Sequence, residues 1–288
     1  MPARILYIPF VLLALLLLYL SWEVSESYAY WLPAPIIVLS VIYVLSPQVN
    51  WWWYVRHTPE LEDAFRRLML DKHPYYARLN LEDKKLFRQR VFLFRLAQDF
   101  MPQGWENVPV DVQTVLSIQA VTLTFGWSNY LLPPYEKVVV YPHAFPSPQF
   151  PKHVHHAELY EEDAVLIFNA RRVMEDTIRS AGSFNIGLYE YARVLLRVHP
   201  RYPWPEEEAA YWEGLERLKG YSRTQVAAHL GLPEKTVEVL PVCLVAYFLQ
   251  PEYLAKALPS LVAGLRDIMQ FDPLAAERLK HPSPEQTA

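Results

Sequence analysis

The sequence has little cysteine and little glycine, and each shortage excludes a class of protein. Cys243 is the only cysteine among 288 residues, so the chain cannot form a disulfide framework of its own. It lies in the apolar run VCLVAYF, which favours a buried, unreactive thiol. Only 8 residues are glycine, and none forms a Gly-rich loop of the kind that cradles phosphate groups. The sequence therefore predicts neither a disulfide-stabilised domain nor a site built on such a loop.

An excess of basic charge is also lacking. The formal net charge is −4, which does not indicate a protein that binds nucleic acid through its overall charge. Hydrophobic residues make up 52% of the chain, which is enough for a sizeable core. We therefore expect a folded protein with no nucleic-acid partner.

Two long runs lack any charged residue. Ile5 to Trp22 is 18 residues long, close to the length that crosses a hydrocarbon core of about 30 Å. The second run extends from Ser27 to Val55, with an extended or kinked entry expected at Pro33 and Pro35. Its end, WWWY, is typical of an interfacial aromatic belt. Residues 1–56 are thus predicted to form a transmembrane hairpin, with spans at about 5–22 and 31–49.

The basic residues around these runs predict an orientation. Arg4 precedes the first run and Arg56 follows the second, whereas the connecting loop carries Glu23 and Glu26 but no basic residue. The positive-inside rule places both ends in the cytoplasm. Residues 57–288 would then form a cytoplasmic domain. A cleavable signal peptide is the competing interpretation, and it is disfavoured because no small-x-small cleavage site follows the first run.

The pattern of residues 57–288 predicts helices, then a small sheet, then further helices, which is an α+β arrangement. Capping residues predict helices that begin near Thr58 and after Asn80. A third helix, apolar on nearly all sides and ended by Gly126, should be buried. Two β-branched runs, Lys137 to Pro142 and Ala164 to Phe168, predict strands.

The stretch NIGLYEYARVLL carries the candidate functional site. In the zinc-peptidase motif His-Glu-x-x-His, the two histidines share one face of a helix and bind zinc, and the glutamate activates the metal-bound water. Here Glu190 stands at the glutamate position, with Tyr189 and Arg193 at the histidine positions. The alternative is an ordinary amphipathic helix in which Glu190 and Arg193 form a weak i,i+3 pair.

Several segments in order resemble the MtfA-type glucose-regulated zinc metallopeptidases, which are gluzincin-like. These segments are VLSIQAVTLTFGW, YEKVVVYPHAF, AVLIFNARRV, NIGLYEYARVLL, and VEVLPVCLVAYFLQP followed by LRDIMQFDP. The resemblance covers about residues 58–275. It implies a bacterial protein with a mostly helical gluzincin-like fold and a small β-sheet. It also implies that Asn185 matches the family pattern, that Glu190 is at the general-base position, and that Glu238 is at the third zinc-ligand position.

Two replacements indicate that the metal site is lost. Arg193 has no lone pair to offer, and its charge opposes a dication. Tyr189 is a neutral phenol and a poor zinc ligand. We therefore expect no metal and no cofactor, although the family uses zinc, with Glu190 vestigial and catalysis absent. The Arg193 guanidinium is predicted to occupy the vacated zinc position and to pair with Glu238, Glu190 or both.

Two other patterns have both a functional and an ordinary structural interpretation. The loop sequence HVHH, His153 to His156, could bind a transition metal, but such loop clusters are more often exposed and empty. Residues Gln225 to Leu240 have helix-turn-helix spacing, but acidic residues and an apolar continuation oppose DNA binding. The simpler prediction there is a helix, a turn and a buried helix.

The sequence thus predicts a multi-pass protein of the cytoplasmic membrane with an inactive peptidase-like domain that faces the cytoplasm. Its partners would be the lipid bilayer and a protein or peptide held in the former substrate cleft, or it would act as a scaffold. One alternative is an active zinc metallopeptidase with relocated ligands, taken from the HVHH loop and Glu238. Another is a purely structural domain, which a cleft filled by its own side chains would favour.

Overall fold

The computed structural model describes residues 3–146, 150, 153–179, 183–206 and 208–279. The chain divides into two compact units, Met1–Pro59 and Glu60–Ala288, which are described separately.

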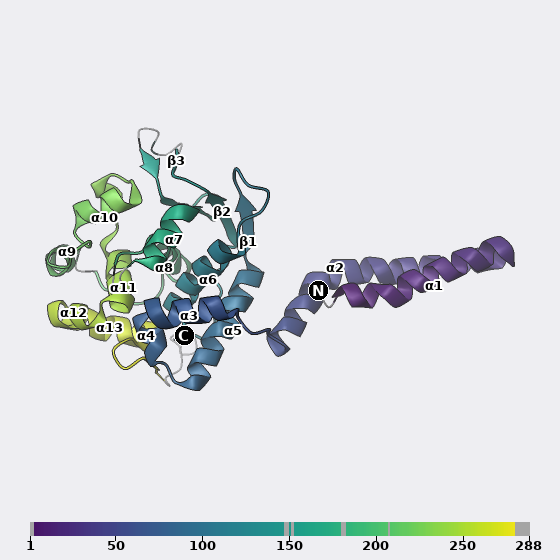
Figure 1. The fold of residues 1–288 in the computed structure, drawn as a ribbon, viewed down its shortest axis with the longest axis horizontal. Helices are drawn as coiled ribbons and strands as arrows, with labels where there is room; N and C mark the ends of the chain where they lie inside the picture. Colours follow the sequence, from purple (N-terminus) through teal and green to yellow (C-terminus); the bar gives the residue numbers. More distant parts are fainter. Residues whose placement is uncertain (1–2, 147–149, 151–152, 180–182, 207, 280–288) are drawn as a thin grey trace. The chain divides into compact units, whose positions relative to one another are not determined.

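The first unit is a hairpin of two long helices joined by a short 3-10 helix (Figure 1). The helices are α1 (Ala3–Glu23) and α2 (Pro33–Arg56), and the connection is η1 (Glu26–Trp31). The backbone N–H of Ala3 donates to Asn50 Oδ1 at 3.0 Å, so the start of α1 lies beside the last part of α2. Both helices are long and apolar enough to cross a membrane, and their apolar side chains are mostly exposed. This agrees with the predicted hairpin and suggests association with a membrane.

Two expected features near the hairpin differ in the structure. Helix α2 begins at Pro33 with no extended entry, because a proline at the first helical position loses no hydrogen bond. Thr58 does not begin the next helix: its hydroxyl donates to Tyr54 O at 2.7 Å, at the end of α2. The next helix, α3 (Asp63–Lys72), starts after Glu62.

The second unit is built around α6 (Val110–Thr124), whose side chains are buried nearly all round, as predicted. Helices α5, α7 and α8 pack against it. Helix α5 (Leu81–Ala97) begins as predicted at Asn80, whose side chain accepts the Asp83 N–H at 2.8 Å. The short α4 (Pro74–Arg78) precedes it.

A four-stranded sheet lies in the order β1-β2-β6-β5. The predicted strands are present as β2 (Lys137–Tyr141) and β6 (Val165–Asn169), which pair in parallel. The edge strands β1 (Asp99–Pro102) and β5 (Ala157–Tyr160) escaped prediction because their short sequences, DFMP and AELY, have no β-branched run. Strand β1 is parallel to β2, and β5 is antiparallel to β6.

Two small hairpins and the remaining helices complete the unit. The hairpins pair β3 (Phe145–Pro146) with β4 (Val154–His155), and β7 (Phe271–Asp272) with β8 (Glu277–Arg278). The helices are α7 (Ala170–Ile178), α8 (Ile186–Val198), α9 (Glu208–Glu216), α10 (Arg223–Leu230), η2 (Glu234–Thr236), α11 (Val239–Leu249), α12 (Pro251–Ala257) and α13 (Pro259–Met269). The α+β class is confirmed.

The segment with helix-turn-helix spacing forms α10, a turn and α11. Helix α11 is buried along most of its length, so it offers no exposed face to a DNA groove. This is the helix, turn and buried helix that the sequence favoured.

Candidate functional site

Helix α8 carries the candidate site and is fixed at its N-terminus by two side chains. The Asn185 side chain accepts the Leu188 N–H at 3.0 Å, as an N-cap residue does. Asp176, on α7, accepts the Ile186 N–H at 3.1 Å from outside the helix. Asp176 is itself buried, so the first turn of α8 is capped by a buried carboxylate from another helix.

Arg193 lies between the two carboxylates that the sequence predicted it would pair with. Its Nη1 is 2.9 Å from Glu190 Oε2, and its Nε is 2.9 Å from Glu238 Oε1. The Glu190 side chain is 0% exposed and that of Arg193 is 15% exposed, so both charges are largely removed from water. The predicted pairing is confirmed, and it is more than a surface i,i+3 contact because it joins α8 to Glu238, the N-cap residue of α11.

Arg197 extends this ion-pair group toward the surface. Its Nη2 and Nη1 bond to the two oxygens of Glu238 at 2.9 and 3.2 Å, and its Nε bonds to Glu161 at 2.9 Å. Glu161 follows β5, so the group connects α8, α11 and the edge of the sheet. Sequence reasoning missed Arg197, although its position four residues after Arg193 places it on the same helix face.

Tyr189 is buried and also contacts Glu238. Its phenol oxygen accepts the backbone N–H of Glu238 at 3.1 Å. Burial, followed by the nearby charge of Glu190, raises the pKa of the phenol far above its ordinary value. The side chain is therefore neutral, and one of its lone pairs is already in use.

The two carboxylates differ in their proton affinity. Burial raises the pKa of Glu190 above its ordinary value, although Arg193 acts in the opposite direction. Its Oε1 has no hydrogen-bond partner among the described residues, which fits this direction. Burial acts in the same sense on Glu238, but Arg193 and Arg197 outweigh it and hold the pKa of that carboxyl below its ordinary value.

Arg193 itself stays charged. Burial acts to lower the pKa of its guanidinium, but Glu190 and the other acidic neighbours more than reverse this and raise it. The guanidinium therefore keeps its positive charge beside the two carboxyl groups.

These side chains do not fit a zinc ion. Both oxygens of Glu238, the one ligand position that keeps its residue type, bond to Arg193 and Arg197. A guanidinium is itself a cation and has no lone pair to offer a metal. Across the described ranges, no three His, Cys, Asp or Glu side chains are grouped so that they could hold a metal. No catalytic step through zinc follows from this arrangement.

The HVHH loop does not supply relocated ligands within the described part of the chain. His155 is buried, with Nε2 3.4 Å from Phe150 O. His156 Nδ1 lies 2.9 Å from Asn169 Nδ2, and burial lowers the pKa of its imidazole. The loop and Glu238 form no metal-capable group. Cys243 is buried, and burial raises the pKa of its thiol, as an unreactive cysteine requires.

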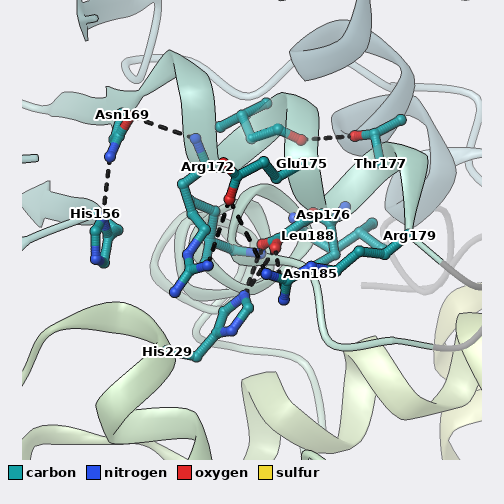
Figure 2. Close-up of polar contacts among 12 residues, drawn as sticks. His156, Asn169, Arg172, Glu175, Asp176, Thr177, Arg179, Asn185, Leu188 and His229 are labelled. Atoms are coloured by element: carbon teal, nitrogen blue, oxygen red, sulfur yellow. Dashed lines mark hydrogen bonds and ion pairs between the residues drawn. The ribbon is translucent and has the colours of Figure 1, made fainter. Parts of the chain in front are cut away.

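A second polar group lies at the other end of α8 (Figure 2). His229 on α10 binds both oxygens of Asp176, at 2.9 and 2.8 Å, and Arg179 approaches the same carboxylate at 3.7 Å. No local sequence pattern predicts this group, because α7, α8 and α10 come together only in the fold.

A family model described as glucose-regulated metallo-peptidase M90 matches residues 49–194, just over half of the chain. The match ends one residue after Arg193, so it includes Tyr189, Glu190 and Arg193 but not Glu238. Among curated proteins, the search found no match.

Proposed function

This chain belongs to the glucose-regulated metallo-peptidase M90 family, and we propose that it is a membrane-anchored, catalytically inactive member with a scaffolding or binding role. The observation that carries the proposal is the Arg193 guanidinium bonded to both Glu190 and Glu238. In this proposal the guanidinium stands where the family holds zinc, and Glu190 is a vestige of the general base. In place of the metal ion, the site holds the positive charge of the Arg193 side chain.

The closure of the site supports scaffolding more than binding at this position. Tyr189 and Glu190 are fully buried, so the floor of the former cleft is filled by the protein's own side chains. Ion pairs from Arg193 and Arg197 to Glu238 tie α8 to the segment that begins α11. In this proposal the ion-pair network holds two parts of the domain together, as a structural zinc does in other proteins.

The proposal includes the fold and the location. The sheet with an antiparallel edge strand next to α8 is consistent with a gluzincin-like domain over residues 57–288. Residues 1–56 would span the cytoplasmic membrane of a bacterium twice. The basic residues that flank the spans favour a cytoplasmic position for the domain.

Metal content tests the proposal. Full-length protein, purified in detergent from zinc-supplemented cells, is expected to hold far less than one equivalent of zinc by elemental mass spectrometry. The double variant Tyr189→His/Arg193→His should gain about one equivalent, because two imidazoles one helical turn apart would join Glu238. The matched control is Tyr189→His/Arg197→His, which leaves Arg193 in place and should gain none.

Two outcomes would contradict it. One equivalent of tightly held zinc in the natural protein would show that the site is not lost. A folded Tyr189→His/Arg193→His variant without zinc would show that these positions are not a vacated metal site.

A further inference from the structure

A hollow of about 680 Å³ opens on the side of the domain formed by α7 and α10. Its walls come from α7, the segment before α8, α10 and the turn before it, and the end of α11. Its lining residues include Arg172, Arg179, Phe184, Leu218, Lys219 and His229. This volume is within the range of ligand-binding clefts, and none of the α8 ion-pair residues lines it.

The charge of this hollow is of one sign. Arg172, Arg179 and Lys219 line it, and among the residues that the structure describes no Asp or Glu does. The chain as a whole carries a net charge of −4, so the three basic side chains around this cleft have the opposite sign to the net charge of the chain. A cleft lined by one sign of charge attracts ligands of the other sign.

The acids nearest to the hollow do not cancel this charge. Glu175 is shared by three arginines, at 2.9 Å from Arg171, 3.6 Å from Arg172 and 4.0 Å from Arg179. The carboxylate of Asp176 is fully buried, and it is engaged by the Ile186 N–H and by His229 (Figure 2). In addition, Arg172 Nε is buried without an acceptor in the described part of the chain. The cations therefore have hydrogen-bonding capacity left for a ligand.

The basic surface is elongated. Arg172 also lines a second hollow of about 320 Å³, together with His143, His156, Arg171 and Glu175, whose carboxylate is already paired with arginines. From Arg171 to Arg179 the helix rise alone spans roughly 12 Å. That distance matches about three to four residues of extended chain and exceeds the reach of one phosphate group. Phe184, Leu218 and Ala228 add apolar surface to the larger hollow.

We propose that these two hollows form one groove that binds an acidic, extended segment of a polypeptide partner. Carboxylates of the segment pair with Arg172, Arg179 and Lys219, and its apolar side chains lie against Phe184 and Leu218. An arginine guanidinium suits a carboxylate because it can donate two parallel hydrogen bonds to it. The groove uses no residue of the Arg193 ion-pair group, so the inference is independent of the loss of zinc.

Fluorescence anisotropy with full-length protein in detergent tests this inference. The probe is a fluorescein-labelled eight-residue peptide of alternating Glu and Leu, with the Gln and Leu analogue as its uncharged control. The Glu peptide should bind and the Gln peptide should not. Arg179→Gln/Lys219→Gln should weaken binding by about tenfold, since each exposed ion pair contributes at most a factor of roughly five.

The matched control is Arg217→Gln/Lys256→Gln, which removes two cations from a different hollow. All four side chains are exposed, so both variants should fold, and the control should bind as the natural protein does. Equal weakening in both variants would indicate general charge attraction and overturn the inference. Absence of binding would also overturn the inference. The same holds if inorganic pyrophosphate displaces the labelled peptide at a lower concentration than unlabelled peptide does.

Discussion

At the scale of the residue, Glu190 is a buried carboxyl group that needs stabilising partners. A carboxylate that is 0% exposed is costly unless a cation and hydrogen bonds accompany it. Arg193 supplies the cation from one helical turn away, and Glu238 holds Arg193 in place from another element. Such buried pairs add little net stability compared with apolar side chains of the same size, but breaking one side of the pair is expensive. The residues are therefore interdependent.

A double-mutant comparison measures this interdependence. Arg193→Met should destabilise the domain by about 3 kcal/mol, because it leaves Glu190 buried without its counter-charge. Adding Glu190→Gln should recover much of that loss by removing the charge. Thermal unfolding of full-length protein in detergent would report it, at roughly 2–4 °C per kcal/mol for a unit of this size.

The control for this comparison is Arg197→Met. Arg197 makes ion pairs with Glu238 and Glu161 but is 34% exposed, so its loss should cost at most about 1 kcal/mol. An Arg193→Met variant as stable as Arg197→Met would show that Glu190 does not need its partner.

At the scale of the element, the position of α8 depends on close approach to α6. A Cβ added at Gly187 would overlap the side-chain amide of Gln119, which is buried in α6 and bonded to Thr177 at 3.2 Å. A residue with a side chain at this position would separate the two helices. Because Tyr189, Glu190 and Arg193 follow within two turns, this contact also sets where the ion-pair group lies.

Gly187→Ala should therefore destabilise the domain by about 2 kcal/mol through overpacking. Gly264→Ala is the matched control, because Gly264 is also helical and a Cβ there would meet nothing closer than 3.7 Å. That change should be neutral or stabilise by up to about 1 kcal/mol. The measurement is the melting temperature of each variant. If the Gly187→Ala protein is as stable as the Gly264→Ala protein, close packing at Gly187 does not set the position of α8.

At the scale of the whole molecule, the hairpin and the domain are separate compact units with different surfaces. The hairpin exposes large apolar side chains along both helices, whereas the domain buries its apolar residues in one core. An exposed apolar surface of that extent is stable in lipid and unfavourable in water. The apolar surface of the hairpin therefore suggests association with a membrane.

The proposed orientation can be measured because the natural cysteine is buried. Cys243 should not react with a maleimide, so Ser25→Cys in the acidic loop and Thr58→Cys after α2 each provide one reporter. In intact cells, a membrane-impermeant maleimide should label Ser25→Cys and leave Thr58→Cys unlabelled until the cells are lysed. The reverse pattern would place the domain on the outside.

The sequence by itself determined α5 with its Asn80 cap, the buried α6, the strands β2 and β6, and the apolar hairpin. These depend on local chemistry: charge-free length, N-cap side chains and β-branched runs. It also predicted that Arg193 would pair with Glu190 and Glu238, because an arginine at the second histidine position can neutralise the two carboxylates expected beside it. Only the tertiary structure placed Arg197 and Glu161 in that group, buried Tyr189 and Glu190, and brought Asp176 together with His229. Those contacts join residues far apart in the chain, and their positions depend on how helices pack, which no local pattern specifies.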